Sequence, residues 1–141
     1  MGVRMPDRPQ ESIELARQAL DTARATHEQG DERAALNRLY YACFHAARGV
    51  LYAKGFDPKT HKGNRMLFGR EVVQPGEASG ADGELLSELQ DLRETADYGL
   101  TPVSANVSSL TARTDDFVAD MVDLIEAETG ADTDTGEEPD D

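Results

Sequence analysis

The chain has 141 residues, with 14 basic against 28 acidic side chains and a formal net charge of −14. This length suits one domain, and the negative charge should repel free nucleic acid over most of the surface. The single cysteine, Cys43, excludes an intrachain disulfide and a multi-cysteine zinc site. No apolar run approaches the roughly 18 residues of a membrane span, and no apolar core follows Arg4 and Arg8 as in a signal peptide. We therefore expect no membrane partner and a cytoplasmic location.

The basic residues are unevenly chosen, with 11 arginines and only 3 lysines. An excess of carboxylates with few lysines indicates a protein from a halophile, where concentrated salt screens the repulsion between like charges. The alternative interpretation is an ordinary acidic cytosolic protein with an acidic tail.

Apolar residues recur every three or four positions along most of the chain, which predicts amphipathic helices. The first should end at Gly30, and Asp31 should cap the second, whose apolar surface is wide enough for the central helix of a bundle. Helices are expected over residues 10–27, 32–54, 64–73 and 83–98, and from 104 onward. We find no alternating strand pattern, so the predicted fold class is all-α, an up-and-down bundle of four to five helices.

The expected bundle covers residues 10–129. Residues 1–9 contain two prolines and are interpreted as a flexible leader. Residues 130–141 carry six acidic side chains, no basic one and no large aliphatic one, so this tail should be disordered.

A polar stripe runs along the second helix beside its apolar face. Arg38, Tyr41, His45 and Arg48 are spaced i, i+3, i+7 and i+10, which places them on one side. Two guanidiniums can neutralise phosphate, and an imidazole can move a proton near neutral pH, so the stripe is a candidate phosphate-binding or acid–base site. The alternative is that the stripe bonds neighbouring helices or faces solvent.

Further candidates follow that helix. His61 stands beside Lys62 in a polar segment, where it could contact a phosphate or cap the short helix. Arg93 and Asp97 are four residues apart and could pair on a helix surface. Tyr98 would reach the same site only if the helix ends or distorts, which the glycine after it permits.

Several familiar motifs are absent from the sequence. There is no Glu-x-x-His, HExxH, Walker A or GxGxxG pattern, so neither a metal nor a cofactor is expected. Cys43 falls on the apolar stripe and is interpreted as a buried, inert thiol. The acidic residues Asp115, Asp116, Asp120 and Asp123 lie near one side of the last helix, most simply as a face in contact with solvent.

Three stretches of the chain together resemble the HEPN family. They are Asn37-Arg38 with Tyr40-Tyr41-Ala42 and Phe44-His45-Ala46-Ala47, then Lys59-Thr60-His61-Lys62-Gly63, then Arg93 with Ala96-Asp97-Tyr98. The most similar branch consists of small uncharacterised HEPN proteins often encoded beside a minimal nucleotidyltransferase. The resemblance implies an up-and-down helical bundle that forms homodimers.

The resemblance also implies an activity and a partner. Many HEPN members are metal-independent ribonucleases whose signature is Arg, four to six residues, then His, with the site formed across the dimer. In some toxin–antitoxin systems a partner nucleotidyltransferase neutralises the toxin by adding AMP to a nearby tyrosine. Here the positions after Arg93 where that histidine would fall are Tyr98, Gly99 and Leu100. Arg38 and His45 also fit the spacing, but they lie in the second helix.

Three hypotheses follow. The first is a toxin that cleaves RNA with Arg93, Tyr98 and His45, with the substrate bound by Arg38, Tyr41, Arg48, His61, Lys62 and Asp97. The second is a non-catalytic module that binds a nucleotide or a minimal nucleotidyltransferase. The second hypothesis is favoured because Tyr98 stands at the first position where the signature histidine would fall. Tyrosine, with an ordinary pKa near 10, is a poor general base at neutral pH. The third is a purely structural helical dimer.

Overall fold

The computed structural model describes the backbone of residues 7–98 and 106–137, and the side-chain environments of residues 7–96 and 106–130. Over these residues the chain forms five α-helices and one π-helical turn, and no strand. The elements are α1 (Arg8–Glu28), α2 (Glu32–Ala53), α3 (His61–Phe68), η1 (Gly69–Val73), α4 (Gly80–Tyr98) and α5 (Val107–Glu137). The predicted all-α bundle is confirmed.

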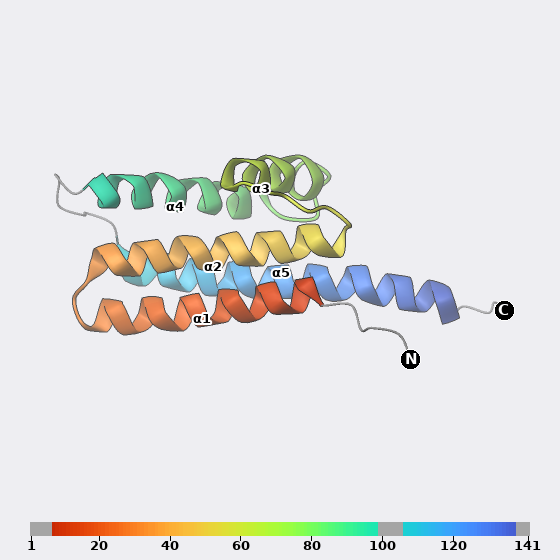
Figure 1. The fold of residues 1–141 in the computed structure, drawn as a ribbon, viewed down its shortest axis with the longest axis horizontal. Coiled ribbons are helices and arrows are strands. Elements are labelled where there is room, and N and C mark those ends of the chain that lie inside the picture. Colours follow the sequence, from red (N-terminus) through yellow and green to blue (C-terminus); the bar gives the residue numbers. More distant parts are fainter. Residues whose placement is uncertain (1–6, 99–105, 138–141) are drawn as a thin grey trace.

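Helix α2 is the centre of the bundle, as its wide apolar surface predicted. It runs antiparallel to α1, α5 lies along both, and α3 and α4 cover another side of α2 (Figure 1). Twelve of its 22 residues are buried. Burying a wide apolar surface of this kind is the main favourable contribution to such a fold.

Side-chain caps set the starts of two helices that carry candidate site residues. Asp31 accepts a hydrogen bond from the Ala34 amide at 3.0 Å, which confirms the predicted cap of α2. Thr60 accepts one from the Gly63 amide at 2.8 Å and begins α3 at His61, three residues before the predicted start. His61 is therefore the first residue of a helix, whereas the sequence placed it in the preceding polar segment.

Helices α1 and α2 approach closely at Gly49. A Cβ atom built there would lie 3.2 Å from the Ser12 Cβ, 3.2 Å from the Ile125 Cδ1 and 3.3 Å from the Pro9 carbonyl oxygen. Only a residue without a side chain fits this contact without a shift of its neighbours. The start of α1 is thereby held against the second half of α2, where His45 and Arg48 lie.

The remaining boundaries differ modestly from expectation. Helix α4 begins at Gly80 because the Ser79 hydroxyl accepts a hydrogen bond from the Asp82 amide at 3.0 Å. Helix α5 continues past Gly130, and the disorder expected over residues 130–141 stays a prediction. The flexible leader over residues 1–9 also stays a prediction, although α1 already begins at Arg8. Within the described residues, no helix combines the length and apolarity needed to cross a membrane.

Candidate functional site

The polar stripe predicted on α2 is present. Arg38, Tyr41, His45 and Arg48 are all partly exposed along one side of the helix, next to its buried face. The first turn of α3 lies against this side and carries His61, whose side chain is also partly exposed. The structure therefore brings His61 of α3 next to the polar stripe of α2, which the sequence could place only on a separate segment.

His61 packs into the aromatic part of α2. Its ring stacks on Phe44, with centroids 4.4 Å apart, and meets the edge of Tyr41 at 5.7 Å. Its Nδ1 lies 2.8 Å from the hydroxyl of Tyr40, a hydrogen bond in which either group can donate. These three contacts fix both the position and the plane of the imidazole.

Helix α4 contributes Arg93 to the same place. Its guanidinium carbon lies 4.9 Å from the ring centroid of Tyr40 and 5.5 Å from that of Tyr41, which are favourable cation–π distances. The side chains of Asp97 and Tyr98 lie outside the described part of the chain, so their predicted roles stay predictions. Lys62, the second residue of α3, is exposed.

Two further arginines complete the group. Arg38 lies 4.9 Å from the ring centroid of Tyr41, and Arg48 lies 5.8 Å from that of Phe44. We call the whole set the arginine–aromatic cluster, and it consists of Arg38, Tyr40, Tyr41, Phe44, His45, Arg48, His61 and Arg93.

Two guanidiniums of the cluster form no ion pair with any described carboxylate. Arg38 donates to the Asn37 side chain, and Arg48 donates to the Pro58 carbonyl at 3.2 Å, while its Nε is buried and forms no hydrogen bond. Six other basic side chains form ion pairs with carboxylates, those of Arg8, Arg24, Lys54, Lys59, Arg70 and Arg113. In a chain of net charge −14, cationic groups left without carboxylates are suited to an external anion.

The cluster keeps its two imidazoles neutral. Burial, together with the positive charges of Arg48 and Arg38 and a smaller effect of His61, lowers the pKa of His45 to about 4. Burial and the charges of Arg93, Arg48 and Arg65 also lower the pKa of His61. Both rings are therefore unprotonated near pH 7 and can accept a proton or a hydrogen bond.

The sequence did not identify Tyr40 as a site residue, because it falls on the apolar stripe and is only 2% exposed. Burial raises the pKa of its hydroxyl, with a smaller opposing effect from Arg93, so the group stays protonated. A buried tyrosine usually finds a partner for its hydroxyl. Tyr40 could have been identified as a site residue from this requirement, because it lies in a helix that carries a row of aromatic and basic residues.

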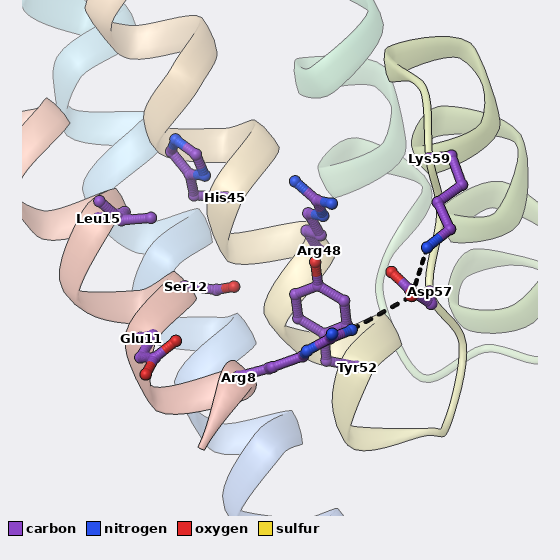
Figure 2. A pocket seen from close by; sticks show the side chains of 9 residues that line it. All are labelled: Arg8, Glu11, Ser12, Leu15, His45, Arg48, Tyr52, Asp57 and Lys59. Atoms are coloured by element: carbon purple, nitrogen blue, oxygen red, sulfur yellow. Dashed lines mark hydrogen bonds and ion pairs between the residues drawn. The ribbon is translucent and has the colours of Figure 1, made fainter. Parts of the chain in front are cut away.

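A pocket adjoins the cluster between α1, the end of α2 and the segment that follows it (Figure 2). It shares His45 and Arg48 with the cluster. Its lining residues are Arg8, Glu11, Ser12, Leu15, His45, Arg48, Tyr52, Asp57 and Lys59. Sequence spacing could not group the residues of α1 with those of α2, since they are distant along the chain.

The other candidate groups behave as structural elements. Cys43 is completely buried against Thr114, and burial raises the pKa of its thiol to about 12, which confirms the inert interpretation. The side chains of Asp115, Asp116, Asp120 and Asp123 are exposed, as expected. Over the described residues, no three His, Cys, Asp or Glu side chains lie close enough together to hold a metal ion.

Comparison with known proteins identifies relatives of the whole bundle. Residues 9–127 match the family model for the HEPN domain. Over 86 residues the chain is 36% identical to a candidate toxin of Methanocaldococcus jannaschii, covering 61% of this chain and 64% of that protein. Over 84 residues it is 34% identical to a UPF0332 protein of Thermotoga maritima, covering 60% and 64%. A UPF0332 protein of Archaeoglobus fulgidus is 36% identical over 88 residues, covering 62% and 70%. The chain thus spans slightly less than two thirds of the first two relatives.

Proposed function

The chain belongs to the HEPN domain family, and from this premise we propose that it is a toxin-like protein whose arginine–aromatic cluster binds RNA and cleaves it without a metal ion. The observation that carries the proposal is the convergence of Arg38, Arg48 and Arg93 with two neutral imidazoles on one side of α2. Burial and the positive charges of neighbouring arginines lower both imidazole pKa values. Such a site favours a phosphodiester and can also take up a proton.

His45 is assigned as the general base of this reaction. It forms no hydrogen bond within the described residues, so its ring nitrogens are open to a substrate. The imidazole takes the proton of a ribose 2′-hydroxyl while that oxygen attacks the adjacent phosphorus. The new 2′-oxygen–phosphorus bond replaces the bond to the 5′-oxygen, which leaves with a proton from solvent. The products are a 2′,3′-cyclic phosphate and a 5′-hydroxyl end.

The guanidiniums are assigned to the negative charge that develops on the phosphoryl oxygens. Preorganised cations in a partly buried site stabilise such charge far more than they would in water. Stacking on Tyr40, Tyr41 and Phe44 holds these guanidiniums in place before substrate arrives. His61, fixed by the Tyr40 hydroxyl, is assigned a positioning role next to the departing oxygen.

The setting of this activity is also part of the proposal. We expect a homodimer in the cytoplasm of a halophile, paired with a minimal nucleotidyltransferase that controls it. High salt matters because screening weakens the repulsion between RNA and a chain of net charge −14. Short-range contacts within the cluster are screened less than that long-range repulsion.

A non-catalytic binding module is the second candidate function. With four to six residues between the arginine and the histidine of the family signature, the positions after Arg93 are Tyr98, Gly99 and Leu100, so that histidine is missing there. In this alternative the cluster holds a nucleotide or the partner nucleotidyltransferase, and no bond is cleaved. Co-elution with that partner at high salt would support it.

Cleavage of single-stranded RNA in high salt with a metal chelator tests the proposal. Wild type is compared with Arg93→Ala and His45→Gln, and with Arg17→Gln, which removes one positive charge from an exposed site on α1. We expect both cluster variants to slow cleavage by at least about 100-fold, and the control to match wild type. Cleavage at the wild-type rate by His45→Gln would refute the base assignment. Absence of cleavage by wild-type homodimer would favour the binding module.

A further inference from the structure

The pocket beside the cluster has its own charge pattern. It has a volume of about 330 Å³ and opens between the start of α1 and the end of α2 (Figure 2). Three cationic side chains, Arg8, Arg48 and Lys59, face two carboxylates, Glu11 and Asp57. The pocket is therefore net positive on a chain whose formal charge is −14, so it is the kind of site that concentrates an anion.

Two of these cations are held by one aromatic ring. The guanidinium carbons of Arg8 and Arg48 each lie 5.2 Å from the ring centroid of Tyr52. Figure 2 shows the Arg8 side chain crossing that ring. Because the ring limits the motion of both side chains, an anion that binds them costs less conformational entropy than it would with free arginines.

Asp57 lies between Arg8 and Lys59 and pairs with both. Its carboxylate lies 3.2 Å from the Arg8 guanidinium and 2.8 Å from the Lys59 amine. Asp57 is exposed, and ion pairs at exposed sites are weak. A backbone phosphate of RNA, with one negative charge shared by two non-bridging acceptor oxygens, can therefore replace this carboxylate as the partner of both cations.

The pocket also continues into the proposed catalytic cluster. His45 lines both, and the buried Nε of Arg48 has no hydrogen-bond partner. A chain of nucleotides bound at His45 would place its next phosphate within this adjoining space. We propose that the pocket is a subsite for single-stranded RNA, in which Arg8 and Lys59 bind the phosphate next to the scissile linkage, while Arg48 lies between this subsite and the cluster. This inference rests on the proposed function.

A binding measurement with RNA that cannot react tests the subsite. The probe is a fluorescent 2′-O-methyl oligonucleotide, which lacks the attacking hydroxyl, titrated with the full chain by anisotropy over a range of salt concentrations. The double variant Arg8→Gln/Lys59→Gln should bind about tenfold more weakly than wild type. The negative slope of log affinity against log salt should become shallower by about 0.7, the loss of one phosphate contact. Asp57→Asn should bind more tightly, because it removes the competing carboxylate.

Two matched controls separate a local from a global effect of charge. Arg17→Gln removes a positive charge from an exposed site on α1, and Asp116→Asn removes a negative charge from an exposed site on α5. Neither residue lines the pocket, so both variants should bind as wild type does. If the control variants changed the affinity for the probe as much as the pocket variants do, the subsite would be overturned.

The outcomes also distinguish the subsite from the proposed function. If wild type cleaves natural RNA but the pocket variants bind the probe as tightly as wild type, the subsite is wrong and the proposed function stands. If wild type binds the probe without cleaving natural RNA, catalysis is refuted and the pocket variants still decide the subsite. If wild type neither binds nor cleaves RNA, both proposals fail.

Discussion

The hydroxyl oxygen of Tyr40 lies 2.8 Å from Nδ1 of His61, and this hydrogen bond joins the middle of α2 to the first residue of α3. Tyr40 is 2% exposed, so its hydroxyl has little access to water and depends on this partner. The bond therefore has two consequences, since it satisfies a buried polar group and also orients the imidazole.

Replacement of Tyr40 by phenylalanine should lower the free energy of unfolding by about 1 kcal/mol, the usual value of one such hydrogen bond. Cleavage should also slow, because His61 loses the contact that orients it. Tyr41→Phe is the matched control, since the Tyr41 hydroxyl makes no hydrogen bond within the described residues. Urea unfolding of the two variants in high salt would measure the difference, and equal losses would contradict the assigned role of this bond.

Stability should fall with acid partly because of His45. Its pKa is near 6.5 in the unfolded chain and about 4 in the folded one, so protons bind the unfolded state preferentially as pH falls below 6.5. The contribution of neutral His45 to the free energy of unfolding is fully present above pH 6.5 and is lost as pH falls toward 4. Between pH 7 and pH 5 the loss should be about 1–2 kcal/mol, allowing for the partial solvent contact of the ring. In urea unfolding, the free energy of unfolding of His45→Gln should therefore decrease between pH 7 and pH 5 by about 1–2 kcal/mol less than that of wild type. An equal decrease in the two proteins would argue against the lowered pKa.

The same lowered pKa predicts the pH dependence of cleavage. A base with a pKa of about 4 is already deprotonated at pH 6, so the His45 limb of the kcat/KM profile should be flat from pH 6 to pH 8. The rate should fall only as pH approaches about 4. A falling limb centred near pH 6.5 in the wild type would instead indicate an imidazole of ordinary pKa and would exclude His45 in its folded environment as the base.

Helical periodicity predicted most of this fold because the elements are long and amphipathic. The central place of α2 followed from the width of its apolar face, and Asp31 and Gly30 marked its start. The start of α3 was placed too late, because the cap formed by Thr60 outweighed the polar character of the residues after it. A single hydrogen bond thus decided where His61 lies.

The candidate site was only partly predictable, for a physical reason. Spacing along one helix places Arg38, Tyr41, His45 and Arg48 on one side, since the helix geometry is fixed. Contacts between elements depend on packing, so the approach of Arg93 and of the start of α1 could not be read from spacing. Arg8 in particular fell in a segment interpreted as a leader, yet it is the first residue of α1 and lines the pocket.

Cys43 should resist modification while the chain is folded. Its thiol is fully buried, and burial raises its pKa to about 12, so both access and thiolate are lacking near neutral pH. A thiol-reactive dye at pH 8 should label less than about one tenth of the folded protein in the time that labels the urea-unfolded protein completely. Rapid labelling in the absence of urea would mean that α2 opens locally around this residue.

Gly49→Ala should destabilise the bundle even though alanine is the better helix former. The propensity gain is up to about 1 kcal/mol, whereas forcing a methyl group into a tight contact typically costs about 1–3 kcal/mol. Here the new Cβ would meet the Pro9 carbonyl oxygen at 3.3 Å, a backbone atom that can yield only if the start of α1 moves.

The matched control for that change is Gly69→Ala, at the junction of α3 and η1, where an added Cβ meets nothing within 4 Å. It should leave stability unchanged or raise it by up to about 1 kcal/mol. Urea unfolding in high salt compares the two variants directly. Because the shift of α1 would also displace Arg8 from Tyr52, Gly49→Ala should bind the 2′-O-methyl probe more weakly than Gly69→Ala does. Equal stability and equal binding would show that the close contact at Gly49 does not position the pocket.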